Sequence, residues 1–128
     1  MIHKLSEVLD LQGGAASSAG IAAASYSSVQ CSAGVDLTKY KGAIGWQINA
    51  GTFGSSATLD AKIQESDDNS TFTDLSPAVA MTQKTAAGQA VLETRVRTFT
   101  KRYGRIALTP AVAAVVAGAT FIGQKRSL

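Results

Sequence analysis

The sequence is poor in the residues that carry most protein chemistry. Its 128 residues include one cysteine, one histidine and two prolines. One cysteine cannot form an intrachain disulfide, and together with one histidine it cannot supply the ligands of a zinc site. His3 lies near the start of the chain, and Cys31 has no basic neighbour in sequence. We therefore expect no enzymatic activity, no metal and no cofactor, and we predict that Cys31 is buried as a small hydrophobic residue.

Charged residues are also scarce, at 16% of the chain, and aromatic residues make up only 6%. Hydrophobic residues reach 45%, so a chain of this length can bury one core without disulfide or metal support. Alanine, glycine, serine and threonine dominate the remainder. A weakly charged surface of small residues is typical of a protein that is buried against other subunits. The alternative explanation of this composition is a plain alanine-rich protein.

The net charge of +3 arises mainly in the last third of the chain, whereas acidic residues cluster around residues 60–74. Arg95, Arg97 and Arg105 fall within segments with the alternation of strands. No aromatic residues interleave these arginines in the manner of a nucleic-acid platform. We interpret them, together with Lys101 and Arg102, as a solvated or subunit-facing basic strip and expect no specific nucleic-acid binding.

An uncharged and largely apolar run of 19 residues lies between Arg105 and Lys125. Its length approaches that of a transmembrane helix, but Pro110 interrupts it and alanine supplies much of its apolar character. We expect two buried strands joined by a turn, and no membrane association. The last strand, at residues 114–123, is apolar on both faces, which is typical of a strand covered both by its own domain and by a neighbour.

Residues 57–75 predict a β-hairpin. Leu59, Ala61 and Ile63 alternate with polar residues, as in a strand with one buried face. Turn-forming residues follow over 66–70, and the chain then resumes an extended pattern.

Oxygen-bearing side chains crowd the turn of this hairpin, namely Glu65, Asp67, Asp68 and Asn69. Such ligands suit calcium, but their spacing does not match an EF-hand loop. We therefore favour a turn stabilised by its own Asp and Asn side chains over a metal site.

Alternation predicts further strands on either side of the hairpin. Ile44, Trp46 and Ile48 share one face of a long strand, and we expect Trp46 to anchor the core. Phe53 lies in a glycine-rich loop, where it either plugs the end of the domain or contacts a partner. Short strands separated by turn signals, with no amphipathic helix after residue 12, predict an all-β, antiparallel β-sandwich. Its later strands are expected at 91–99, 103–109 and 114–123.

The first 25 residues predict an extended N-terminal arm. A short apolar stripe, which consists of Ile2, Leu5, Val8 and Leu9, precedes a low-complexity segment of small residues at 13–25. Nothing in that segment is expected to anchor a core. We assign residues 1–25 to an arm that contacts another subunit, with a disordered tail as the alternative, and residues 26–128 to the sandwich domain.

A family resemblance appears across residues 34–123. The stretch Gly34–Tyr40 (GVDLTKY), the strand ending in Ile63–Asn69 (IQESDDN), the segment Thr71–Leu75 (TFTDL) and the later Tyr103–Ile106 (YGRI) together resemble small β-sandwich structural proteins of tailed bacteriophages. This resemblance implies a jelly-roll-like sandwich. It rests on the fold and carries no catalytic residue.

The resemblance implies a non-enzymatic virion protein that is assembled in the cytoplasm of the bacterial host. We expect a capsid decoration or cement protein, a homo-oligomer that binds the major capsid protein or other virion subunits. The alternatives are a head-tail connector, neck or tail structural protein, and a β-sandwich module that binds carbohydrate or a cell surface. Contacts to subunits or to the lattice are expected from Ile2, Leu5, Val8, Leu9, Phe53, Arg95, Arg97 and Arg105.

Overall fold

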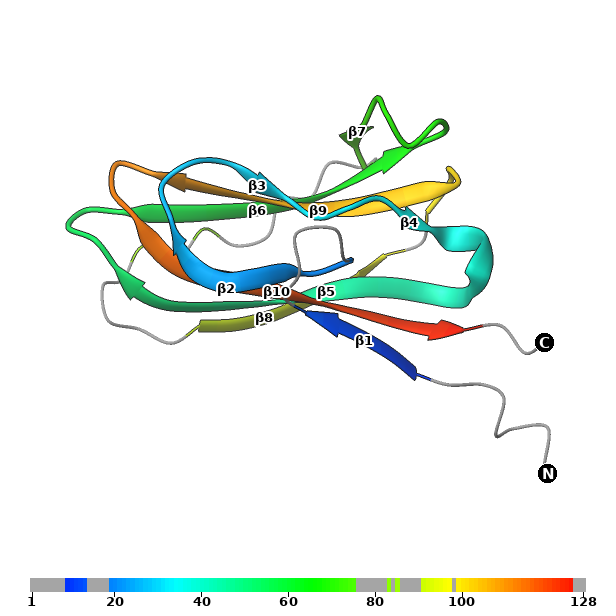
Figure 1. The fold of residues 1–128 in the computed structure, drawn as a ribbon, viewed down its shortest axis with the longest axis horizontal. Helices are drawn as coiled ribbons and strands as arrows, with labels where there is room; N and C mark the ends of the chain where they lie inside the picture. The colour runs from blue at the N-terminus through cyan, green and yellow to red at the C-terminus, as the bar shows by residue number, and fades with distance from the viewer. Residues whose placement is uncertain are drawn as a thin grey trace.

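The computed structural model describes residues 9–13, 19–75, 83, 85, 91–97 and 99–125. For residues 9–13, 42–43 and 91–97 it describes the backbone alone. The described chain forms two β-sheets that lie face to face, seen as the upper and lower layers of Figure 1. All strand pairs are antiparallel, so the predicted all-β sandwich is confirmed.

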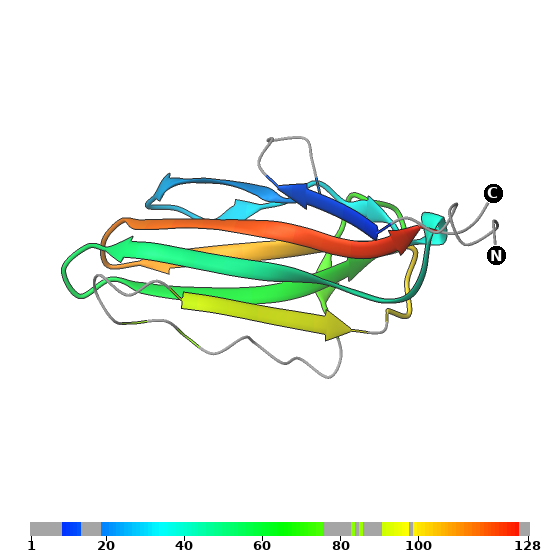
Figure 2. The same cartoon turned by 90° about the horizontal axis from the view of Figure 1, so that it is seen from below.

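Sheet A has two long strands at its centre. These strands, β10 (Val115–Lys125) and β5 (Tyr40–Phe53), pair with each other, and β5 also pairs with β8 (Val91–Arg97). The other edge of β10 holds β1 (Leu9–Gly13) and β2 (Ile21–Tyr26), one after the other. Figure 2 shows β8, β5, β10 and β1 side by side.

Sheet B repeats this arrangement on the opposite side of the core. Its central pair is β9 (Tyr103–Ala111) with β6 (Thr58–Ser66), and β6 also pairs with the short β7 (Thr73–Asp74). The other edge of β9 holds β4 (Val35–Asp36) and β3 (Gln30–Cys31) in turn. A short 3-10 helix, η2 (Leu37–Lys39), leads from β4 into β5.

The predicted hairpin exists as the β6–β7 pair. Gln64 lies opposite Asp74 and Glu65 opposite Thr73. Leu59, Ala61 and Ile63 are buried, as their alternation predicts. The main partner of β6 is nevertheless β9, a pairing with a partner distant in sequence.

Trp46 is fully buried at the centre of the sandwich, which confirms its role as a core anchor. Its ring meets that of Phe121 edge to face, with centroids 5.2 Å apart, and Phe121 meets Tyr40 in the same manner at 5.1 Å. The indole nitrogen donates a hydrogen bond to the carbonyl oxygen of Ala19 at 2.6 Å. Such edge-to-face pairs add about 0.5–1.5 kcal/mol each beyond the burial of their area.

That hydrogen bond corrects the predicted boundary of the N-terminal arm. Ala19 and Ile21 are buried in the core, with 8% and 7% exposure, and β2 is part of sheet A. The prediction that residues 13–25 contain no core anchor is therefore wrong for residues 19–25. The backbone of β2 packs closely on β10, since a Cβ atom at Gly118 would lie 3.0 Å from the Cα atom of Ala23. Residues 1–8 lie outside the described part of the chain.

The β5–β6 and β9–β10 connections both cross between the sheets and meet at one end of the sandwich. Gly54 donates its N–H to the carbonyl oxygen of Ala114 at 2.8 Å, and a Cβ atom on Gly54 would lie 2.7 Å from that of Ala113. Val112 has φ of 73° and 80% exposure, an unusual conformation for a β-branched residue. The turn that we predicted after Pro110 is therefore present. Within the described ranges, no helix is long and apolar enough to cross a membrane.

Truncation of a core residue in either sheet should destabilise the fold. We expect Ile44→Ala in sheet A and Ile63→Ala in sheet B to lower the free energy of unfolding by about 2–5 kcal/mol each, because both leave a cavity. Val116→Ala, at a residue with 39% exposure, is the control and should change it by less than about 1 kcal/mol. Denaturant unfolding measures all three variants, and equal stabilities would refute the assignment of buried faces.

The hydrogen bond from Trp46 should secure the start of β2. Trp46→Phe keeps an aromatic ring but leaves the carbonyl oxygen of Ala19 without its donor, a loss of about 1–3 kcal/mol. Hydrogen exchange should then accelerate first at residues 19–22. Tyr26→Phe removes a hydroxyl that donates to the carbonyl oxygen of Ala22 at the sheet edge, and it should have a smaller effect. An unchanged exchange pattern in Trp46→Phe would show that the N-terminal segment is held by other contacts.

Candidate functional site

The outer face of sheet A carries no charged residue across its central rows. Along β10, Val115, Ala117, Ala119 and Phe121 are buried in the core. Successive residues of a strand point to opposite faces, so the residues between them face away from the core. These outward residues are Val116, Gly118, Thr120 and Ile122.

Strand β5 continues the same surface. Asn49 lies opposite Gly118, Gln47 opposite Thr120, and Gly45 opposite Ile122. Residues directly opposite each other in an antiparallel pair share a face of the sheet. We call this surface the sheet A face, and define it as Val116, Gly118, Thr120, Ile122, Gly45, Gln47 and Asn49.

The backbone register extends these uncharged rows to the neighbouring strands. On β8, the positions paired with Gly45, Gln47 and Asn49 are Val96, Thr94 and Leu92. On β1, the positions paired with Ile122 and Thr120 are Leu11 and Gly13. In the backbone register, the residues paired with these rows on β1 and β8 are therefore uncharged as well. The next row, at Gln124, is the first with a charged member, Lys41.

The outer face of sheet B is different, because charged residues there bind one another. Lys62 on β6 forms an ion pair with Asp74 on β7 at 3.0 Å, and Gln64 donates to the same carboxylate at 3.0 Å. These contacts, led by the hydrogen bond from Gln64, lower the pKa of Asp74. Arg105 donates to Gln64 at 2.8 Å and lies over the ring of Phe72 at 4.1 Å. Sheet B therefore presents a hydrated, internally paired polar surface.

The contrast between the two faces indicates where another molecule can cover the sandwich. Interface cores are depleted of charge, since a buried charge needs a partner that offsets its lost hydration. The sheet A face can be covered without burying any charge among its described residues. The sequence pointed to this face through the apolar outer residues of the last strand, but not to the contribution of β5, which depends on long-range register.

The arginines of the predicted basic strip are divided between the two sheets. Arg95 and Arg97 lie on β8 in sheet A, in register with Trp46 and Ile44. Arg105 lies on β9 in sheet B, opposite Gln64. The three arginines thus belong to two different sheets, because β8 and β9 are consecutive in sequence but cross from one sheet to the other.

Other predicted contact residues have separate positions. Phe53 ends β5 with 4% exposure, so the structure supports the alternative in which it plugs the end of the sandwich. Leu9 begins β1, where only its backbone is described, and Ile2, Leu5 and Val8 lie outside the described residues. Cys31 is exposed, contrary to prediction, because the two-residue strand β3 turns Ser32 inward instead.

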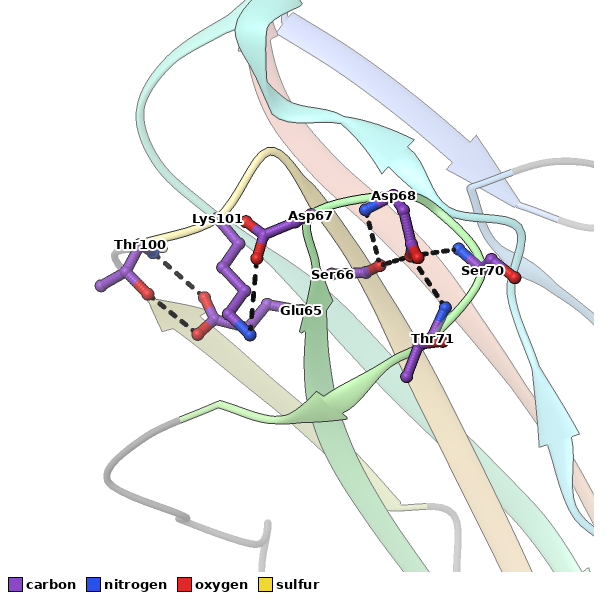
Figure 3. A network of polar contacts seen from close by, with 8 residues as sticks. All are labelled: Glu65, Ser66, Asp67, Asp68, Ser70, Thr71, Thr100 and Lys101. Carbon is purple, nitrogen blue, oxygen red and sulfur yellow. Dashed lines mark hydrogen bonds and ion pairs between the residues drawn. The ribbon is translucent and has the colours of Figure 1, made fainter.

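The acidic turn is held by its own polar groups, as Figure 3 shows. Asp68 accepts hydrogen bonds from the N–H groups of Ser70 and Thr71, both at 2.9 Å, and from the hydroxyl of Ser66 at 2.8 Å. Glu65 is 5% exposed and accepts from the N–H of Thr100 at 3.0 Å and from its hydroxyl at 2.9 Å. These bonds confirm the predicted self-stabilised turn. Across the described ranges, no group of three or more potential metal ligands occurs.

A second contact fixes the same end of the sandwich. The side chain of Arg102 donates to both carboxylate oxygens of Asp36, at 3.3 and 3.1 Å. The carbonyl oxygen of Arg102 accepts a hydrogen bond from the N–H of Leu37 at 2.8 Å. The hydrogen bond from Arg102, helped by Thr38, holds the pKa of Asp36 well below its ordinary value. The loops at this end are therefore built as a fixed structure around the strands.

Comparisons with known proteins add no assignment to this geometry. No protein-family model and no curated protein matches the sequence.

The turn around Asp68 should resist acid. Hydrogen bonds from Thr71 and Ser70 lower the carboxyl pKa from 3.8 to about 2. A lowered pKa in the folded state stabilises the fold above the unfolded value, and this contribution disappears as the pH falls through about 2. We expect the Asp68 carboxyl carbon to titrate near pH 2 by NMR. Asp68→Asn keeps an acceptor oxygen but removes this titration, and a pKa near 3.8 in the parent would contradict the hydrogen-bonded turn.

Proposed function

We propose that this chain is a non-enzymatic structural protein of a tailed bacteriophage particle, with capsid decoration as its role. In this role the sheet A face lies on the capsid lattice, and the sheet B face and the fixed acidic turn face solvent. The observation that carries the proposal is the charge-free sheet A face opposite a sheet with internally paired charges. The assignment to a phage particle rests on the sequence resemblance across residues 34–123.

We further propose that the sandwich is a jelly roll, and its strand order supports this. If β3 and β4 count as one interrupted strand, and β1 is set aside, eight strands run from β2 to β10. The first pairs with the last, the second with the seventh, the third with the sixth and the fourth with the fifth. This is the pairing that results when one long hairpin is rolled into two sheets, and jelly rolls are common among capsid proteins.

The size of the sheet A face determines how such a protein would attach. Four strands about 4.8 Å apart and seven residues of about 3.3 Å each give an area on the order of 400 Å². A stable interface covers about 800 Å² on each partner. One face is thus too small for tight binding alone, which favours attachment of several linked copies to a repeating lattice.

The alternatives receive different support. A neck or tail subunit would use the same face, so only the location of binding separates it from a decoration protein. A carbohydrate-binding module would stack sugars on exposed aromatic residues, but the only tryptophan, Trp46, has 0% exposure. We therefore do not propose the carbohydrate-binding alternative.

A lysine on the sheet A face should weaken attachment. We expect Thr120→Lys, at the centre of this face, to weaken binding at least tenfold, because the ammonium group would be buried without a partner. The matched control is Thr109→Lys on the outer face of sheet B, at a residue of similar partial exposure.

Co-sedimentation with purified heads, and separately with tails, of the phage that encodes the chain measures this binding. Thermal melts establish that both variants remain folded. Binding to tails alone would support the neck or tail alternative. Equal loss in both variants, or attachment of neither the parent nor the variants to any particle, would overturn the proposal.

A further inference from the structure

One edge of β10 pairs with two separate strands, β1 and β2. Gly13, the last residue of β1, lies opposite Thr120, and Ile21, the first residue of β2, lies opposite Ala119. These partners are adjacent on β10, yet seven residues, 14–20, separate the two strands in sequence. The chain uses seven residues to advance one position along the edge. β1 thus pairs with β10 as a separate strand and does not continue directly into β2.

The attachment point of this strand is fixed at residue 19. The carbonyl oxygen of Ala19 accepts the hydrogen bond from Trp46 at 2.6 Å, and Ala19 and Ile21 are buried. Ala19 and Ile21 are therefore anchored in the core of their own chain. Replacement of β1 would leave these core contacts intact.

Among the described strands, β1 pairs with β10 alone. Its five register pairs, from Leu9 with Gln124 to Gly13 with Thr120, use backbone groups that every copy of the chain presents in the same way. A second copy can therefore supply the same strand with the same pairing. Exchange of an identical element creates no new contact and needs only a connection of sufficient length.

The connection has that length. Residues 14–18, which join Gly13 to Ala19, are Gly-Ala-Ala-Ser-Ser. Six backbone steps in extended form span roughly 20 Å, enough to reach the β10 edge of an adjacent sandwich. Without β1, residues 120–124 of β10 would expose backbone N–H and C=O groups at the edge of the sheet. Such an edge favours pairing with another strand.

We propose that β1 is an exchangeable strand, and that in the assembled protein residues 9–13 of one copy pair with β10 of a second copy. The proposed occupant of this edge is thus another copy of the same chain. Exchange links two sandwiches through the backbone pairing of β1 with β10, with the connection at 14–18 joining β1 to its own sandwich, and it leaves each core complete. The proposal does not depend on which particle the protein joins.

Cysteine pairs placed by register test the exchange. Leu11 lies opposite Ile122, and opposite residues of antiparallel strands have Cα atoms about 4.5–5.5 Å apart, a separation that a disulfide can bridge. In a Cys31→Ser background, one mass-labelled chain carries Leu11→Cys and a second chain carries Ile122→Cys. The two are unfolded, mixed, refolded together and oxidised. A chain with both substitutions reports the pairing within one copy.

We expect a disulfide between the two single variants, with a yield that rises with protein concentration, and closure within one chain for the double variant at low concentration. The off-register control, Leu11→Cys mixed with Thr109→Cys on sheet B, should give at least tenfold less cross-linked product. Mass spectrometry identifies each species. The proposal is overturned if the mixed variants give no more product than the control while the double variant closes within one chain. It is equally overturned if the double variant forms no disulfide at all, because β1 would then not pair with β10.

Discussion

The buried indole of Trp46 connects three parts of the chain that are distant in sequence. Its ring packs against Phe121 on the neighbouring strand and against Phe99 ahead of β9, with centroid distances of 5.2 and 6.3 Å, and its nitrogen binds the carbonyl oxygen of Ala19. A fully buried N–H needs an acceptor, since an unpaired one costs about 1–3 kcal/mol. The N-terminal segment must therefore reach Trp46 before β2 begins. The hydrogen bond fixes the chain at Ala19, between β1 and β2, and both of these strands pair with β10.

The outer faces of the two sheets differ in the charged residues that strand pairing brings together on them. On sheet B, Lys62, Asp74 and Arg105 have partners within the same face, so water can cover that face at little energetic cost. On sheet A, the residues of β10 and β5 that face outward are small, amide-bearing or aliphatic. Sheet A also contains charged residues, but none of them belongs to the outward residues of β10 over 116–122 or of β5 over 45–49, which leaves that surface suited to contact with protein.

The features that the sequence predicted correctly depend on neighbours in the chain. Alternation in β6 and the turn chemistry around Asp68 are local, and so is the placement of Ile44 and Trp46 on a buried face. The features it missed depend on pairing with distant strands. Whether Arg95 or Thr94 lies opposite Trp46 is decided by the register between β8 and β5, and a shift by one residue would exchange the two. Ala19 has no sequence signal as a core residue, because its role is a backbone carbonyl aimed at an indole 27 residues away.

The small area of the sheet A face and the separate attachment of β1 have related consequences. A contact on the order of 400 Å² per partner binds weakly because the loss of translational and rotational freedom offsets most of the burial. Exchange of β1 would join neighbouring sandwiches, so that after the first face docks, each further face is held at a high effective concentration beside its own site. The translational and rotational entropy of association is then lost once for several contacts. The summed free energy of these contacts determines how long the linked copies stay bound. A shorter connection between Gly13 and Ala19 would restrict which neighbours can be joined, so the length of residues 14–18 sets the spacing at which linked copies can dock.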